Sequence, residues 1–216
     1  MAAGALWVTA STGSTPAVQT LLRLNPETAS IALPGAASSD LSANAAGTVL
    51  VVGEADSGGR GAVQRRDPAT GALVASYPIM GVSAPAVAGP FGSAVWVSEA
   101  TGMMGYVQRL DAATMTAAGS ACAEGGTTST CVEGTNDITA RLAGGLLWIT
   151  QIAGGQARNY CADPVTGRKI APIELPQPTQ DEVLAITPQQ IFYAAPGPAA
   201  DQYLRQEPIP SACRTR

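Results

Sequence analysis

The stretch AVWVSEATGMMGYVQRLDAATM, residues 94–115, contains the unit that decides the fold of this chain. It holds an apolar run around Trp96, a short gap with two glycines, a second apolar run and a turn that starts at Asp111. Each run is short, contains β-branched or aromatic residues and is bounded by Gly, Ser, Thr or Asp, which is typical of β-strands. The stretch therefore predicts a strand, a connection, a second strand and a tight turn.

The same unit occurs five times along the chain. The centres of the first run are spaced by 44, 45, 52 and 44 residues, and they are Trp7, Val51, Trp96, Trp148 and Phe192. The second run ends 18, 16, 15, 15 and 15 residues later, at Asn25, Asp67, Asp111, Asp163 and Glu207. A period of this length, built from short strands and turns, is typical of β-propeller blades. We therefore predict an all-β fold, a β-propeller of about five four-stranded antiparallel blades in one domain over residues 1–216.

The blade units occupy, approximately, residues 1–38, 39–83, 84–121, 135–175 and 180–216, with an insertion at 122–131. Only MAAGA precedes the first unit's apolar run, so the innermost strand of that blade is missing, and the last unit ends at its third strand. We expect an incomplete ring, in a chain that lacks an N-terminal portion with an export signal. A closed five-bladed ring sealed by its own ends is the alternative. Open blade edges also favour self-association.

The turn after the second run repeats a pattern, which reads DPATG at 67–71 and DPVTG at 163–167. The Asp accepts hydrogen bonds from the backbone that follows, Pro presets its own φ, and Gly allows a positive φ. Because one such Asp occurs per blade around a ring, these carboxylates do not converge on a ligand, and we interpret them as turn residues. The three Trp residues lie at equivalent places among Leu, Val and Ile, which predicts packing between blades.

An arginine precedes the end of the second run by two residues in four units, and these residues are Arg23, Arg65, Arg109 and Arg205. We expect each to pack its stem along the blade and to pair its head with an acidic turn residue. Cys161 takes this place in the fourth unit, and Cys213 follows the last strand. The sequence therefore allows a Cys161–Cys213 disulfide, which would fasten the C-terminal segment.

Two further cysteines, Cys122 and Cys131, bracket the longest spacing between units. The Gly-, Thr- and Ser-rich loop between them can reach disulfide geometry, so we predict that they are bonded. Disulfides persist in oxidising compartments, which favours an extracytoplasmic, secreted or cell-surface location.

Composition limits the classes of function. The net charge is −4 and Lys169 is the only lysine, so no basic cluster for nucleic acid is expected. No apolar stretch is long enough to span a bilayer. The chain has no histidine, no Ser/His/Asp or Cys/His set and no zinc-ligand spacing. We therefore expect a protein without catalytic activity, metal or cofactor.

The phrases ALWVTA (5–10), AVWVSEA (94–100), LLWIT (146–150) and VQRRDPATG (63–71) resemble repeats of bacterial extracytoplasmic β-propellers. These are the streptogramin-lyase-like, surface-layer-type (YVTN-like) and quinoprotein-like groups, and the resemblance extends over the whole chain at the level of blades. It implies the fold more than a function, because such repeats serve scaffolds and enzymes alike. For a lyase of this group, the resemblance implies a histidine that acts as the catalytic base. This chain has no histidine, so none of the family's catalytic positions is carried over to it.

The sequence favours a non-catalytic extracytoplasmic module that binds a protein or a small molecule. The connection inside each unit and the connection between units lie at one end of the blades, and candidate binding residues there are Glu54, Asp56, Arg60, Glu99 and Gln151. One alternative is a divergent lactonase or lyase in which Glu54, Asp56 and Glu99 hold a divalent cation such as Ca²⁺. Another is a structural repeat of a larger surface protein.

Overall fold

The computed structural model describes residues 6–11, 19–24, 29–33, 36–44, 46–58, 60–80, 86–101, 104–121, 135–153, 156–173, 183–187, 189–196 and 202–214. These residues form five antiparallel sheets in which consecutive strands are hydrogen-bonded neighbours. The predicted Cys122–Cys131 disulfide lies outside the described residues.

The first sheet contains β1 (Trp7–Ser11), β2 (Gln19–Arg23) and β3 (Ala29–Leu33). The second contains β4 (Ala36–Ala43), β5 (Leu50–Asp56), β6 (Arg60–Arg66) and β7 (Leu73–Met80). The third contains β8 (Ala86–Phe91), β9 (Ala94–Thr101), β10 (Met104–Asp111) and β11 (Ala117–Ala121). The fourth contains β12 (Thr135–Ala143), β13 (Leu146–Ala153), β14 (Gln156–Ala162) and β15 (Lys169–Ile173). The fifth contains β16 (Val183–Ile186), β17 (Gln190–Pro196) and β18 (Gln202–Pro208), followed by the short 3-10 turn η2 (Ser211–Cys213).

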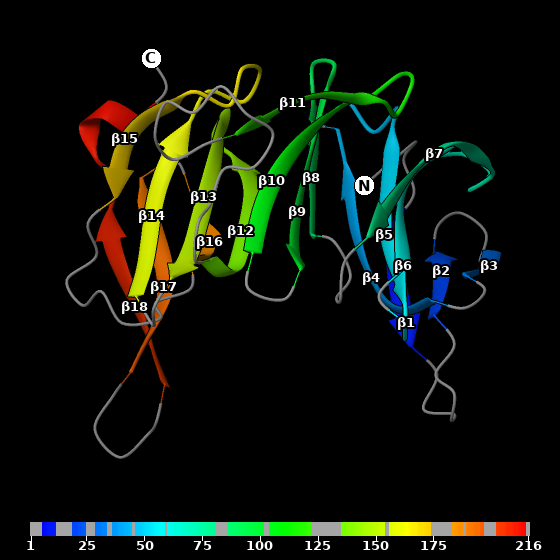
Figure 1. The fold of residues 1–216 in the computed structure, drawn as a ribbon, viewed down its shortest axis with the longest axis horizontal. Helices are drawn as coiled ribbons and strands as arrows, with labels where there is room; N and C mark the ends of the chain where they lie inside the picture. Colours follow the sequence, from blue (N-terminus) through cyan, green and yellow to red (C-terminus); the bar gives the residue numbers. More distant parts are fainter. Residues whose placement is uncertain are drawn as a thin grey trace.

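The sheets stand side by side along an arc, in chain order from the blue first sheet to the orange and red last one (Figure 1). The innermost strands are β4, β8 and β12, and β8 packs against both of the others. The prediction of an all-β propeller is therefore confirmed. Three sheets have four strands, whereas the first and last have three among the described residues. The first sheet begins there with the strand of Trp7, and the last ends with its third strand.

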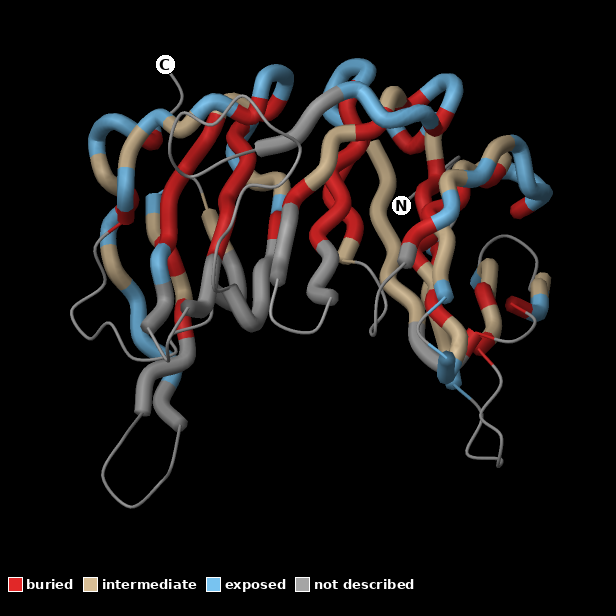
Figure 2. Tube along the Cα trace, viewed as in Figure 1, coloured by how far each residue is buried: buried red, intermediate tan, exposed pale blue. Residues whose placement is uncertain are grey.

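The hydrophobic core consists of layers between neighbouring blades, seen as buried segments along the strands in Figure 2. Side chains alternate between the two faces of each strand, so a central blade contributes to two layers. On β5, Leu50 and Val52 pack with Trp7 of the first blade, whereas Val51 packs with Val95 and Met115 of the third. Burial on both faces explains why these strands read as nearly continuous apolar runs.

The tryptophans pack between blades, and two of them also donate a hydrogen bond to the next blade. Trp7 Nε1 donates to the Pro68 carbonyl at 3.0 Å, and Trp96 Nε1 donates to the Pro164 carbonyl at 2.7 Å. Both acceptors are the second residue of the Asp-Pro-x-Thr-Gly turn. Trp148 has a different partner, because its Nε1 donates to the Ala143 carbonyl of its own sheet.

Two of the aligned arginines reach the corresponding turn of the next blade, but they bind carbonyl groups and not the predicted carboxylates. Arg65 Nη1 donates to the Ala113 carbonyl at 2.9 Å, and Arg109 Nη1 donates to the Val165 carbonyl. Both acceptors are the third residue of the next blade's turn. The Asp side chains are already used inside the turns, which explains why the guanidinium groups meet carbonyl oxygens.

Each of these turns is closed by its own Asp. Asp67 Oδ1 accepts hydrogen bonds from Ala69 N at 2.9 Å, Thr70 N at 2.7 Å and Thr70 Oγ1 at 2.9 Å. Asp111 and Asp163 accept the equivalent three bonds. The backbone hydrogen bond from Thr70 is the main reason that the pKa of Asp67 is lowered. These carboxylates therefore hold the turns in shape.

Gly71 ends the second blade's turn with a φ of +74°. A Cβ at this position would lie 1.9 Å from Cδ1 of Ile31 and 2.9 Å from the Trp7 ring, so the neighbouring blade leaves no room for a side chain. In the third blade Met115 has the equivalent place with a φ of +54° and is buried in the layer that contains Val51. The turn and the blade facing it are thus matched in volume.

The last blade is attached by a different kind of bond. Cys161 lies on β14 opposite Trp148, where the second and third blades carry an arginine, and it forms a disulfide with Cys213. The alignment of Arg205 with the other arginines is wrong by one residue, because β17 and β18 pair Phe192 with Gln206. Gln206 is therefore the structural equivalent of Arg109, which lies opposite Trp96.

We predict that Trp96→Phe destabilises the protein by about 2 kcal/mol, since a buried hydrogen bond and part of the packing are lost. Amide exchange in the turn at 163–167 should become faster, because Pro164 loses its partner in the third blade. Trp148→Phe is the control, as its lost hydrogen bond lies within one sheet. Equal exchange rates in the two variants would contradict a role for Trp96 in holding the next blade.

We predict that Cys161→Ser with Cys213→Ser lowers the free energy of unfolding. The bond closes a loop with a sequence separation of 52 residues, for which chain entropy gives about 4 kcal/mol. Urea unfolding of the double variant, and of the wild type with and without reductant, measures this. Unchanged stability in all three would show that packing of Ile191 and Ile209 alone holds the last blade.

Candidate functional site

The predicted binding residues lie on three successive blades, near the loop that connects the second and third strands of each blade. Glu54 and Asp56 are on β5, and Arg60 begins β6. Glu99 is on β9 and Gln151 on β13, but their side chains lie outside the described part of the structure. The backbone therefore places Glu54, Asp56, Glu99 and Gln151 on equivalent second strands, and Arg60 on the third strand of the second blade.

Asp56 and Arg60 shape the hairpin between β5 and β6. Asp56 Oδ1 accepts hydrogen bonds from Gly58 N at 2.8 Å and Arg60 N at 2.9 Å, and Arg60 Nε pairs with Oδ2 at 3.0 Å. The backbone N–H of Arg60 is the main reason that the pKa of Asp56 is lowered. Both oxygens thus have partners inside the hairpin, and the carboxylate acts as a turn residue.

Glu54 points into the layer between the first and second blades, on the face of β5 that carries Leu50 and Val52. Gln64 Nε2 donates to Glu54 Oε1, and Arg66 Nε donates to Gln64 Oε1 at 2.9 Å. Arg66 Nη1 continues the chain to the Gly71 carbonyl at 2.9 Å. The residue is thus part of an interior polar network and not of a solvated loop.

The nearby charge of Arg66 offsets part of the cost of burying the Glu54 carboxylate. Burial raises the pKa of Glu54, and the charge of Arg66 opposes the shift. Burial lowers the pKa of Arg66 in turn. Glu54 Oε2 is buried without a hydrogen-bond partner in the described structure. Glu54 and Asp56 therefore belong to separate hydrogen-bonded groups, Glu54 with Gln64 and Asp56 with Arg60.

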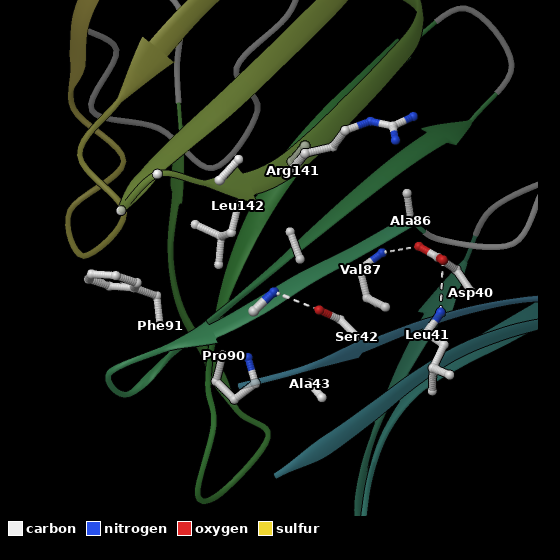
Figure 3. Close-up of a pocket in the computed structure, with 16 residues that line it drawn as sticks. Asp40, Leu41, Ser42, Ala43, Ala86, Val87, Pro90, Phe91, Arg141 and Leu142 are labelled. Atoms are coloured by element: carbon white, nitrogen blue, oxygen red, sulfur yellow. Dashed lines mark hydrogen bonds between the residues drawn. The ribbon is translucent and has the colours of Figure 1, made fainter. Parts of the chain in front are cut away.

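A cavity of about 790 Å³ lies along the innermost strands. Its lining comes from three successive blades, over residues 40–43 of β4, 86–91 of β8 and 140–145 at the end of β12 (Figure 3). The sequence predicts that small residues such as Ala86, Ala88 and Gly89 fill a crowded axis. Ala88 and Gly89 are indeed buried, and a Cβ on Gly89 would lie 2.9 Å from the Ala94 carbonyl oxygen, so these two positions are crowded although they line the cavity.

Polar side chains fix two walls of this cavity to each other. Asp40 Oδ2 accepts a hydrogen bond from Val87 N at 2.8 Å, and its Oδ1 accepts one from Leu41 N at 2.8 Å. Ser42 Oγ accepts a hydrogen bond from Gly89 N at 3.0 Å. These bonds join β4 to β8 without a continuous ladder, so the wall is preorganised.

The cavity has an apolar part and a charged part. Pro90, Phe91 and Leu142 line it near the turn between β8 and β9, and Phe91 is 39% exposed. In Figure 3 the exposed Arg141 side chain extends from β12 away from Phe91, toward the side where Asp40 is drawn. The arrangement suits a ligand with an apolar body and a polar or anionic group.

The sequence gives a weak signal for this site, since short runs of Ala, Ser and Gly in the innermost strands are all that distinguishes it. Among the described residues no three His, Cys, Asp or Glu side chains gather as metal ligands. No helix in the described ranges is long and apolar enough to cross a membrane.

Comparison with protein families and with curated protein sequences finds no match to the chain. Solved structures do match in fold. Prolyl oligopeptidase B from Galerina marginata is 9% identical with a TM-score of 0.64, covering 97% of this chain and 31% of that one. TolB from Acinetobacter baumannii is 13% identical with a TM-score of 0.62, covering 94% and 49%. The Dos1 propeller is 13% identical with a TM-score of 0.53, covering 87% and 50%.

At such low identities the similarity shows the β-propeller fold alone. The chain spans between 31% and 50% of the length of these three structures. The finer resemblance to streptogramin-lyase-like, surface-layer-type and quinoprotein-like repeats stays a prediction.

We predict that Glu54→Gln changes how stability depends on pH. A carboxyl with a raised pKa in the folded state stabilises most below its ordinary value of 4.5, and this contribution falls as pH rises through the raised pKa. Glutamine does not titrate, so the variant lacks the fall. Urea unfolding of both proteins at about pH 4 and about pH 7 should show the variant gaining relative to wild type at the higher pH. A difference that is the same at both values would contradict the burial of Glu54.

Proposed function

We propose that this protein is a non-catalytic binding module that acts outside the cytoplasm and takes a small ligand in the cavity along β4, β8 and β12. The cavity carries the proposal. Its volume of about 790 Å³ lies within the range of about 300–1,000 Å³ common for small-molecule sites. It is also built from rigid strands, which keep recognition groups in place at little entropic cost.

The lining supports a ligand with two kinds of surface. An apolar or aromatic part packs against Pro90, Phe91 and Leu142, while a carboxylate, sulfonate or phosphate group lies toward Arg141. Backbone groups of the Ala- and Gly-rich strands are close to the space, because these residues have little or no side chain to cover them. Main-chain N–H and C=O groups can therefore also bind the ligand by hydrogen bonds.

The chemistry of the described lining supports binding over catalysis. Asp40, the acidic residue of the lining, has both carboxylate oxygens occupied by backbone N–H groups. In the alternative with a divalent cation, Glu54, Asp56 and Glu99 would have to converge. Glu54 and Asp56 are each held by other groups, and no observation favours that alternative.

A location outside the cytoplasm is supported by the Cys161–Cys213 disulfide, since such bonds form and persist under oxidising conditions. The net charge of −4 and the single lysine favour a partner other than nucleic acid. A role as one structural repeat of a larger surface protein remains compatible with binding, because the blades would then present the cavity as part of an array.

The proposal is tested with 8-anilinonaphthalene-1-sulfonate, an anion with an apolar body whose fluorescence rises on binding. We expect saturable binding with one molecule per chain. Phe91→Ser and Arg141→Gln should each weaken it about tenfold, corresponding to the loss of one aromatic contact or one charged contact. Leu73→Ser is the matched control, because Leu73 is 55% exposed and lies on β7, away from the cavity.

Binding that is equally strong in the wild type and in all three variants would place the dye elsewhere and contradict the cavity as the site. A signal that does not saturate would do the same. Circular dichroism of each variant establishes that the β-structure is retained.

A further inference from the structure

The outer edge of β18 has the features of a pairing surface. β18 is the last strand of its sheet and pairs with β17 over seven residues without a register shift. In the second, third and fourth blades the equivalent edge is covered by β7, β11 and β15. In the described part of the chain no strand covers the edge of β18.

The register identifies which backbone groups face outward. Ile209 N donates to the Gln189 carbonyl at 3.0 Å, which continues the pattern of the β17–β18 pair. Hydrogen-bonded and non-hydrogen-bonded pairs alternate in an antiparallel ladder. The N–H and C=O groups of Leu204 and Gln206 therefore point to the open edge. Pro208 belongs to the same set, so its missing N–H is not needed by β17.

The side chains along this edge are complementary to themselves. If a second β18 pairs antiparallel with a two-fold axis at Gln206, then Arg205 lies opposite Glu207 of the partner subunit, and this happens twice. Leu204, which is 69% exposed, lies opposite the partner's Pro208 on the other face, also twice. Opposite charges directly across a ladder stabilise it, and the Arg–Glu pairs fall at the closely spaced non-hydrogen-bonded positions.

The neighbouring register is less favourable. A two-fold axis at Arg205 would put two arginines directly opposite each other, which destabilises an antiparallel pair. With the axis at Gln206, the two copies of this residue face each other, and the outward N–H of each donates a hydrogen bond to the outward C=O of the other. We propose that a second copy of this chain pairs with β18 in this register and joins two five-blade arcs through one continuous six-stranded sheet.

The contact is isologous, because the same surface is used by both copies and the assembly closes at two. Edge pairing of one strand buries less than the area of a standard interface, so we expect a dissociation constant on the order of micromolar. The proposal goes beyond ligand binding and does not involve the cavity. A dimer can thus form whether or not the cavity binds a ligand.

Cysteine cross-linking tests the register directly. The Cα atoms of the two Gln206 residues are expected about 5.5 Å apart, within disulfide range. Gln206→Cys should therefore give a covalent dimer on mild oxidation, seen by non-reducing electrophoresis. Leu204→Cys is the matched control, since the two copies of residue 204 would be about 14 Å apart along the strands, too far to bridge.

A charge exchange tests the pairing of Arg205 with the partner's Glu207. Arg205→Glu or Glu207→Arg alone should raise the dissociation constant about tenfold, because each puts like charges opposite each other. The double variant restores the opposite charges and should bring the constant back to near the wild-type value. Sedimentation equilibrium measures all four proteins, and circular dichroism shows that each one is folded.

Three outcomes overturn the proposal. The wild type is a monomer at about 100 μM, which is well above the expected dissociation constant. Alternatively, Leu204→Cys cross-links as readily as Gln206→Cys, or the double charge exchange fails to restore association. A monomer whose β18 amides are protected from exchange would show that another segment of the same chain covers the edge.

Discussion

Neighbouring blades share no hydrogen-bonded ladder among the residues that the structure describes, so the fold depends on how one sheet packs against the face and the turn of the next. The recurring solution is a side-chain donor aimed at a backbone carbonyl. Trp7 and Trp96 reach the second residue of the next blade's turn, and Arg65 and Arg109 reach the third. The turn can offer these carbonyls because its Asp satisfies the amides on the other side. The spacing between blades therefore follows from a local motif and two side chains.

The same logic accounts for the cavity. Outer and middle strands are spaced by the bulky layers between blades, whereas the innermost strands β4 and β8 carry many Ala, Gly and Ser residues and fill less space. Asp40 and Ser42 join β4 to β8 by side-chain acceptors, which keeps the strands adjacent without closing the space in front of them. The arc thus combines a rigid periphery with an open inner face. This is the arrangement from which binding is proposed.

The sequence predicted the fold well because its evidence is local and repeated. The spacing of Trp7, Trp96 and Trp148 and the turns beginning at Asp67 and Asp163 each depend on a few neighbouring residues. The direction of Glu54 was harder to predict, although its even spacing from Leu50 and Val52 indicates the shared face. The misalignment of Arg205 had another cause, because the register of the last hairpin differs by one residue and a single shift reverses the face.

The cavity could not be predicted in the same way. Its size depends on where the inner strands come to lie, which the packing of many distant residues determines together. Small residues in these strands are compatible with a crowded axis as well as with an open one. Which of the two occurs depends on the curvature of the arc, a property of the assembled blades and not of any one segment.

The match between Gly71 and Trp7 has a consequence for how this array can vary. Where the first blade presents a large indole, the facing turn ends in a residue without a side chain, and where the second presents Val51, the facing turn ends in Met115. In the first interface the large residue is on the strand and the small one is in the turn, whereas in the second interface the larger residue is in the turn. Position 51 and position 115 are therefore expected to mutate as a pair during evolution, with an indole tolerated at one only when glycine replaces methionine at the other. Two blades of the same chain thus fill the same volume between strand and turn in two different ways.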